Sequence, residues 1–404
     1  MLSFTVSLYL AEFGVRYGLH SREERAAGAA SFFTSWKNEY IQDLVPSGKI
    51  EDFKRLDDCA FSQTTTAHPY LNYVHHDQGV CGRNMLTRQG TISHHELPFY
   101  QSEESYDILV VGGSVASIFV EGGQSSPWLE EELNRRYISP NGKAFRVIGG
   151  ALGGWGQPNQ ITMISQYGSA VHAVLNIDGY NETLSMAGKM SMEMPPAMAY
   201  FTVRPFSETM WIRRLVTVSH WIYKWALHSW GKHSFLLYDM FRSLIFLLNH
   251  QMNKDPDGPF EQYLFKYFRL PDEWSKEKRY EWNYRRYEIY SRQMKALAET
   301  QGLNYLHVLQ PIRWIGKDLT PEEKSPPQLI TAEQYQPLID IFEKLKSEGF
   351  PVLDLTQVFA LEKGRIYSDH IHYVVGDGWK SRGNELLSKS IAEAMAQYWN
   401  LRER

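Results

Sequence analysis

The chain contains few cysteines: Cys59 and Cys81 are the only two in 404 residues. Two cysteines allow one disulfide in an oxidising compartment or two buried thiols, and the sequence leaves both open. Neither cysteine is placed like a catalytic thiol. Cysteine-based catalysis is therefore not indicated.

A block of like charge is also missing. The 42 basic and 46 acidic residues are well mixed, the net charge is −4 at pH 7, and there is no acidic tail. Proteins that bind nucleic acid usually carry a basic block or tail. We therefore expect no nucleic-acid partner.

No hydrophobic run is both long enough and free enough of charge to predict a transmembrane helix. Ser234–Leu248 is strongly apolar, but Asp239 and Arg242 lie inside it. Met1–Ala11 is apolar as well, yet a helix that spans a bilayer needs about 20 residues. Met1–Ala11 therefore fits either the end of a membrane anchor or signal segment, or an amphipathic helix packed on the domain.

Apolar and aromatic residues are abundant. Apolar residues make up 43% of the chain, which is ample for a large buried core. The chain also has 12 tryptophans and 24 tyrosines, which suit a surface that faces sugars or a membrane, although large cores use them too.

From residue 108 onward, the chain predicts an alternation of strands and helices. Apolar runs predict strands at 108–111, 145–148, 171–177, 305–309 and 352–355. Helical patterns cover 115–136, 156–168, 332–348 and about 379–400. Such an alternation predicts an α/β fold with helices on both faces of a parallel sheet.

Three segments differ from this alternation. Residues 1–45 predict an N-terminal helical segment, and residues 46–105 predict an irregular wrap around a catalytic domain at 106–404. Within that domain, residues 184–300 are rich first in methionine and then in tryptophan and basic residues. We expect a helical insertion there, which forms either a lid, a substrate groove or a structural cap.

Ser114 follows Gly112 and Gly113 at the end of the first predicted strand of the sheet. Glycines permit a tight turn and leave the serine hydroxyl uncrowded, and a following helix presents amide groups to an anion. The same arrangement occurs in phosphate-binding loops. No Gly-Lys-Ser/Thr pattern follows here, which disfavours that alternative.

Asp369 and His372 provide the parts of a general base. In a catalytic triad the imidazole takes the serine proton, and the carboxylate orients the imidazole. His370 offers an alternative, because His370 and His372 have a spacing that suits a metal when further ligands exist, such as the histidines between residues 68 and 95. The serine and amide motifs favour the triad, and we expect no metal and no organic cofactor.

Two further positions suit an oxyanion hole, which needs preorganised hydrogen-bond donors. Asn181 follows the third predicted strand and offers a side-chain amide. Gly153 and Gly154 follow the second, where a backbone amide serves the same purpose. Asn181-Glu182-Thr183 is also a glycosylation sequon, but it comes directly after a buried strand.

In chain order, Gly112-Gly113-Ser114, Gly153-Gly154, Gly179-Tyr180-Asn181 and Asp369-x-x-His372 resemble the four sequence blocks of the SGNH/GDSL hydrolase family. The resemblance covers about residues 106–182 and 351–400. It implies a three-layer α/β/α fold of the flavodoxin-like type. It also implies roles: Ser114 as nucleophile, Ser114, Gly154 and Asn181 as oxyanion donors, His372 as base and Asp369 as its partner.

The blocks also depart from the family pattern. The first reads Gly-Gly-Ser-Val instead of Gly-Asp-Ser-Leu, the third ends Asn-Glu instead of Asn-Asp, and Gly149 stands where an asparagine is usual. None of these changes removes a catalytic group. The wording VVGGSVA, GGWGQPNQ and NIDGYNE resembles a bacterial branch whose members often begin with a membrane anchor. This favours a periplasmic or other extracytoplasmic location, with or without a membrane anchor, over a cytoplasmic one.

The predicted function is therefore ester hydrolysis through an acyl-Ser114 intermediate. The expected substrate carries an O-acyl group on a carbohydrate or cell-envelope polymer, and Trp155, Gln157, Tyr180 and Gln310 are candidates to bind it. Transfer of the acyl group to a sugar hydroxyl is one alternative. A protein that keeps the fold and only binds carbohydrate is another.

Overall fold

The structure is a computed structural model that describes residues 2–20, 65–75, 80–81, 84–120, 127–186, 190–193, 233–237, 239–240, 268–325, 328–373 and 381–404. Its contacts divide the chain into two units, Met1–Pro46 with Val203–Tyr267, and Ser47–Thr202 with Phe268–Arg404. Much of the predicted insertion at 184–300, residues 21–45 and the side chains of both cysteines lie outside the described residues. The domain boundaries therefore stay predictions.

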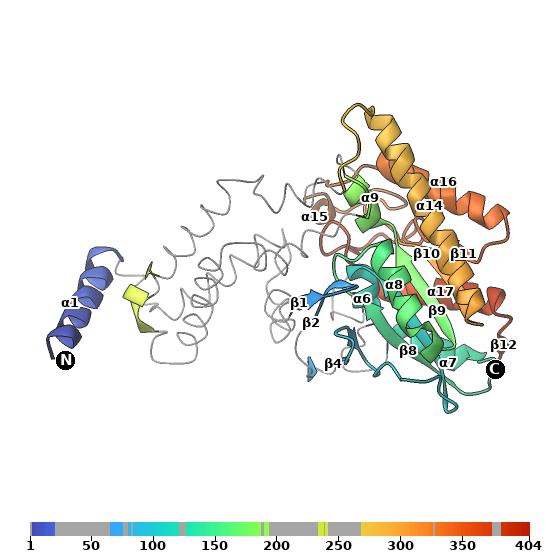
Figure 1. Ribbon diagram of the computed structural model, residues 1–404, viewed down its shortest axis with the longest axis horizontal. Coiled ribbons are helices and arrows are strands. Elements are labelled where there is room, and N and C mark those ends of the chain that lie inside the picture. Colours follow the sequence, from blue (N-terminus) through green and yellow to red (C-terminus); the bar gives the residue numbers. More distant parts are fainter. Residues whose placement is uncertain are drawn as a thin grey trace. The chain divides into compact units, whose positions relative to one another are not determined.

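The larger unit contains a five-stranded parallel sheet (Figure 1). Its strands are β6 (Ser105–Gly112), β8 (Ala144–Ala151), β9 (Ala173–Asp178), β10 (Asn304–Leu309) and β11 (Val352–Asp354). They lie in the order β11-β10-β9-β6-β8. Numbered along the chain, this is the 2-1-3-4-5 order of flavodoxin-like folds. The prediction of an α/β fold with a parallel sheet is confirmed.

Helices cover both faces of the sheet because its strands bury alternate side chains in opposite directions. Ile108 and Val110 of β6 pack in one apolar cluster with α6 (Ser114–Val120), α7 (Trp128–Arg136) and α17 (Arg382–Tyr398). Leu109 and Val111 pack in a second cluster with α8 (Gln157–Tyr167) and α14 (Lys276–Thr300). The continuous apolar run of β6 is therefore a strand buried on both faces.

The remaining elements are short, apart from α16 (Ala332–Ser347), which packs against β10, β11 and α14. The region predicted as irregular contains a hairpin of β1 (Thr65–His68) and β2 (Asn72–His75), and a small sheet of β3 (Val80–Cys81), β4 (Asn84–Leu86) and β5 (Ile92–Ser93). β7 (Tyr137–Ile138) pairs with β12 (Arg402–Glu403). The others are η2 (Gly168–Ala170), α9 (Tyr180–Met186) and α15 (Pro321–Lys324).

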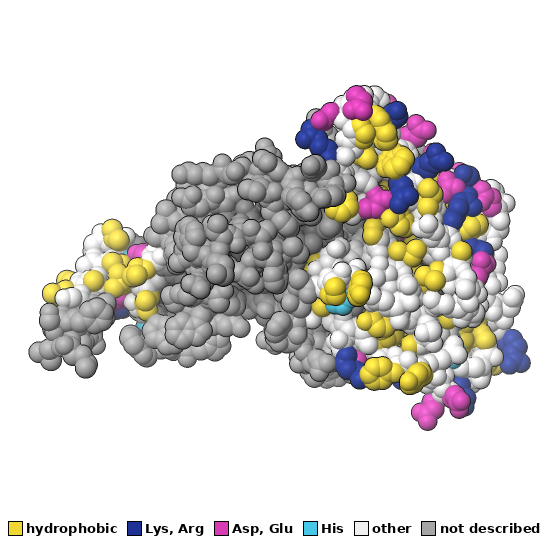
Figure 2. Space-filling model, viewed as in Figure 1, with side chains coloured by type: hydrophobic (Ala, Val, Ile, Leu, Met, Phe, Trp, Pro, Cys, Tyr) yellow, Lys and Arg dark blue, Asp and Glu magenta, His cyan; other side chains and the backbone are white. Residues whose placement is uncertain are grey.

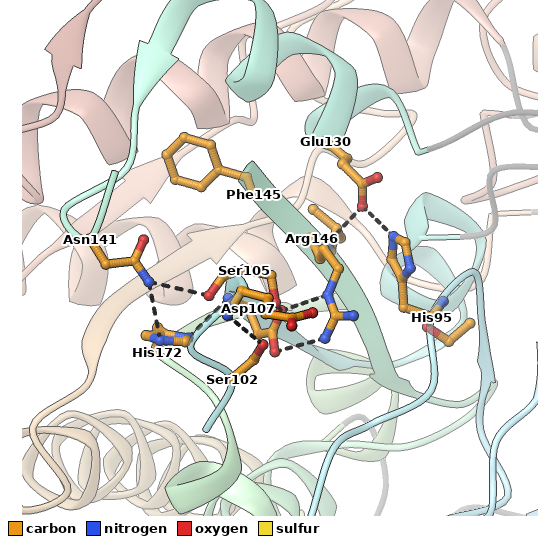
Figure 3. Close-up of polar contacts among 12 residues, drawn as sticks. His95, Ser102, Ser105, Asp107, Glu130, Asn141, Phe145, Arg146 and His172 are labelled. Atoms are coloured by element: carbon orange, nitrogen blue, oxygen red, sulfur yellow. Dashed lines mark hydrogen bonds and ion pairs between the residues drawn. The ribbon is translucent and has the colours of Figure 1, made fainter. Parts of the chain in front are cut away.

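A polar network joins β6 and β8 near the amino-terminal ends of these strands (Figure 3). Asp107 of β6 is fully buried, and the guanidinium of Arg146 on β8 donates to its two carboxylate oxygens at 2.8 and 2.9 Å. The Ser105 hydroxyl donates to the same carboxylate at 2.7 Å. The hydrogen bond to Asp107 raises the pKa of Arg146. An ion pair thus links the amino-terminal ends of β6 and β8, whereas Ser114 follows the carboxyl end of β6.

The smaller unit is described only in α1 (Leu2–Gly18) and in short stretches around residue 235. The Glu12 carboxylate of α1 accepts the Phe235 and Leu236 backbone amides at 3.0 Å each and the Ser234 hydroxyl at 2.6 Å. Asp239, inside the apolar run, lies 3.0 Å from the His20 ring. In the described parts of the chain, no helix combines the length and apolarity needed to cross a bilayer.

On the described surface seen in Figure 2, basic and acidic side chains are interspersed, with small hydrophobic groups between them. The mixing of basic and acidic residues along the sequence is thus also seen on the folded surface.

Candidate active site

The candidate site lies where the strand order reverses. β6 has β8 on one side and β9 on the other, so the crossovers that leave β6 and β8 run over opposite faces of the sheet. Ligands of open α/β sheets bind at the carboxyl ends of the strands beside such a switch point. Ser114 follows β6 there, and Asn181 follows β9.

Two glycines bring Ser114 to this position. Gly112 has φ +151°, and a Cβ atom on it would lie 2.1 Å from the Ile177 carbonyl oxygen of β9. A Cβ atom on Gly113 would lie 2.2 Å from Nδ2 of Asn181 and 3.0 Å from the Trp155 carbonyl oxygen. The chain turns from strand to helix only because no side chain occupies these spaces.

Ser114, His372 and Asp369 form a continuous chain of hydrogen bonds. Oγ of Ser114 lies 2.8 Å from Nε2 of His372, and Nδ1 of His372 lies 2.6 Å from Oδ2 of Asp369. Because an ionised carboxylate only accepts hydrogen bonds, Nδ1 must carry the proton. Nε2 is then left with a lone pair that accepts the serine hydroxyl, which is the arrangement of a general base.

The Asp369 carboxylate is buried, and both of its oxygens are hydrogen-bonded. Its Oδ1 atom accepts the backbone amides of Ile371 and His372, each at 2.8 Å. Burial alone raises the pKa of Asp369, but the His372 ring and these amides outweigh it and lower that pKa well below the ordinary value. Burial lowers the pKa of His372, and the Asp369 charge and hydrogen bond overcome this and raise it. The pair thus holds a charged aspartate beside a basic imidazole.

The candidate oxyanion donors Gly154 and Asn181 lie on two segments that contact the turn before Ser114, since a Cβ atom on Gly113 would meet both Asn181 and the Trp155 carbonyl. Gly154 has φ +80°, a left-handed conformation that glycine adopts at little cost. Asn181 lies in the first turn of α9, and its Nδ2 atom donates to the Trp155 carbonyl at 2.8 Å. This bond fixes the orientation of the Asn181 side-chain amide. Their roles as oxyanion donors stay predictions.

The four candidate substrate-binding residues are all buried. Trp155 and Gln157 have no exposed surface. The buried Gln157 amide donates to Asp178 and to Ser291, each at 3.2 Å. Tyr180 is 5% exposed and lies against the His370 ring at 5.5 Å, and Gln310 is 4% exposed. Tyr180 therefore borders the loop that carries Asp369, His370 and His372, here called the triad loop. Trp155 and Gln157 face the interior.

Asp178, at the end of β9, belongs to a buried polar cluster behind the site. Its carboxylate accepts the Tyr287 hydroxyl at 2.6 Å and lies 2.9 Å from the His307 ring. Asn176 donates to it at 2.9 Å. These contacts keep the pKa of Asp178 low despite its burial. Asp178 is therefore a buried hydrogen-bond acceptor for side chains of β9, β10 and α14.

Glu323 is a residue that the sequence reasoning missed. One of its carboxylate oxygens accepts the backbone amides of Ile366 and Tyr367 at 2.8 and 2.9 Å, directly before the triad loop. The other accepts the Lys317 ammonium at 2.9 Å, and both side chains are fully buried. Thr320-Pro-Glu-Glu323 is a capping-box signature, which the structure realises at α15. That signature marks the turn but not its contact with residues 366 and 367.

His370 and His372 do not meet at a common ligand site. His372 uses both ring nitrogens within the triad, and His370 packs on Tyr180. Among the described residues, no three His, Cys, Asp or Glu side chains gather as a metal site would require.

No protein-family model and no curated protein matches the chain. Among solved structures, the chain resembles a putative acylhydrolase from Bacteroides fragilis, with 12% identity and a TM-score of 0.34. The match covers 75% of this chain and 91% of that one. A likeness this distant transfers no chemistry, so the roles of these residues rest on their own geometry.

Proposed function

We propose that the chain is a serine ester hydrolase of the SGNH type that works through an acyl-Ser114 intermediate. The observation that carries the proposal is the unbroken hydrogen-bond chain from Asp369 through His372 to Ser114. An isolated serine hydroxyl is a weak nucleophile at neutral pH, and a base within hydrogen-bond reach activates it.

The reaction follows from the positions of the protons. Oγ of Ser114 bonds to the ester carbonyl carbon while its proton passes to Nε2 of His372, and the carbonyl electron pair moves to oxygen. As that pair returns, the carbon–oxygen bond to the alcohol breaks, and His372 gives the alcohol its proton. Water then attacks the acyl group in the same way and restores the Ser114 hydroxyl. Throughout, the Asp369 charge stabilises the imidazolium.

The negative charge on the substrate oxygen needs donors that are fixed before the reaction begins. The backbone amides of Ser114 and Gly154 and the side chain of Asn181 are the proposed donors. What supports this is the position of Asn181 over Gly113, the residue before the nucleophile, and its bond to the loop that carries Gly154.

The proposed substrate is an O-acyl ester of a carbohydrate. The hairpin beside the Gly154 loop supports it, because Tyr70 at the tip of that hairpin is 68% exposed. An aromatic ring with one polar group and an open face suits contact with a sugar ring.

A fluorophosphonate probe tests the central proposal, since it phosphonylates only an activated serine. The purified full chain is treated beside Ser114→Ala and His372→Ala variants, and the labelled peptide is identified by mass spectrometry. We expect labelling at Ser114 that is lost in the first variant and strongly slowed in the second. A folded wild-type protein that remains unlabelled would sink the proposal. Positive labelling would be followed by hydrolysis assays on p-nitrophenyl acetate and acetylated oligosaccharides.

A further inference from the structure

We propose that Tyr73 is a positioning residue of this site: its hydroxyl holds the peptide between Gly153 and Gly154 so that the Gly154 amide is aimed at the substrate oxygen. This inference rests on the proposed function. Tyr73 lies in β2, more than thirty residues before the first of the four sequence blocks, in the region that the sequence predicts to be an irregular wrap.

The contact is a single buried hydrogen bond. The Tyr73 side chain has no exposed surface, and its hydroxyl donates to the Gly153 carbonyl oxygen. Burial of a hydroxyl without a partner is unfavourable, so this bond is strongly preferred over an open position. Burial also raises the pKa of Tyr73, which keeps the donor proton in place at neutral pH.

Peptide geometry converts this contact into control of the neighbouring amide. The described residues contain no cis peptide bonds, so the Gly153 carbonyl and the Gly154 amide point in opposite directions within one planar unit. Fixing the carbonyl therefore fixes the amide. A peptide between two glycines rotates with little steric hindrance, because neither residue has a Cβ atom. This is the peptide bond in the loop that most needs an external partner.

The rest of the loop is already held from the sheet. The Leu152 amide donates to the Gly112 carbonyl at 3.4 Å, and the Trp155 amide donates to the Leu152 carbonyl at 3.1 Å. The Trp155 carbonyl accepts from Asn181 at 2.8 Å. These bonds fix the two ends of the loop but leave the central peptide free to turn. The Tyr73 hydroxyl holds that central peptide.

The hairpin that carries Tyr73 is itself docked on the same region. The Asn159 side chain, in the first turn of α8, donates to the Leu71 carbonyl at 2.9 Å. The Leu71 amide donates to Nδ1 of His68 at 3.1 Å, which shapes the turn. Leu71 and Tyr73 pack in one apolar cluster with Trp155 and with residues of α8. The hydroxyl is therefore held against the loop from several sides.

Tyr73→Phe tests the inference because it removes the hydroxyl and keeps the ring. Tyr284→Phe is the matched control, since its hydroxyl donates to the Gln334 carbonyl at 2.7 Å between α14 and α16. Turnover of p-nitrophenyl acetate is measured per active site titrated with a fluorophosphonate, together with thermal midpoints. Loss of a whole oxyanion donor costs about 100- to 1,000-fold in kcat, so loss of its anchor should cost about 10- to 100-fold.

We expect that fall in kcat for Tyr73→Phe with KM changed less than about threefold, and no change in either for Tyr284→Phe. A misfolded fraction lowers the titrated site number and leaves turnover per site unchanged, so instability is not mistaken for the effect. Wild-type turnover per site in Tyr73→Phe would overturn the inference while the hydrolase stands. Wild-type protein that lacks Ser114 labelling would overturn both.

Discussion

The backbone of Gly113 lies directly against the side-chain amide of Asn181: a methyl group added to Gly113 would stand 2.2 Å from Nδ2. The nucleophile turn and the proposed oxyanion donor are thus packed together with no spare volume. This explains how a glycine at the position before Ser114 suits the site, although the sequence block that it resembles has an aspartate there.

Gly113→Ala should therefore remove most of the proposed ester hydrolase activity while the protein stays folded. The methyl group must displace Asn181 or the Trp155 carbonyl, and we expect kcat/KM for p-nitrophenyl acetate to fall at least about 100-fold, as after loss of an oxyanion donor. Gly364→Ala is the control, because a Cβ atom there meets nothing within 4 Å. Equal activity of the two variants would refute the packing argument.

Activity should rise with pH as His372 loses its proton. Because the Asp369 charge raises the pKa of His372, we expect the midpoint of kcat/KM to lie above the ordinary imidazole value of about 6.5. In Asp369→Asn that charge is gone and burial remains, so the midpoint should move down and kcat should fall about 10,000-fold. A pH profile whose midpoint is the same in both proteins would assign the titration to another group.

Glu323→Ala should destabilise the loop that holds the triad. It removes four hydrogen-bond contacts and leaves the buried Lys317 ammonium unpaired. Breaking a buried ion pair from one side costs about 3–5 kcal/mol, which urea unfolding can measure. Lys363→Ala removes a nearby pair whose side chains are 79% and 89% exposed, and should change stability by less than about 1 kcal/mol. Similar losses in both variants would contradict the anchoring role.

Stability should fall as pH rises towards 8 because of Glu182. Burial and the Asp178 charge raise the pKa of Glu182 to about 8, whereas in the unfolded chain it titrates near its ordinary value of about 4.3. Between these values the native state binds more protons than the unfolded state, so the free energy of unfolding decreases with pH. Glu182→Gln should flatten this slope in urea titrations from pH 5 to 8.

A surface variant provides the comparison for that measurement. Glu299→Gln changes a side chain that is 59% exposed and whose ion pair among the described residues is with Lys295, so its slope should equal that of the wild type. If Glu182→Gln also keeps the wild-type slope, the buried carboxyl does not carry the pH dependence.

Much of the architecture was predictable because its signals are local. A strand buried on both faces must be a short apolar run, and residues 108–111, 145–148 and 305–309 are such runs and lie within β6, β8 and β10. The two glycines before Ser114 likewise predict a tight turn. Burial of Trp155 and Gln157 was not predictable, since a position just past a strand end leaves the direction of the side chain open.

The sequence by itself determined the α/β layers, the strand-end positions of Ser114 and Asn181, and the three-residue spacing of Asp369 and His372. Only the tertiary structure decided that the Ser114 hydroxyl meets the His372 ring across 258 positions. It also decided that Tyr73 bonds to the Gly153 carbonyl and Glu323 to the amides of residues 366 and 367. Local patterns report burial and turn geometry along the chain. Contacts between distant segments depend on strand order and side-chain direction, which only packing of the whole sheet specifies.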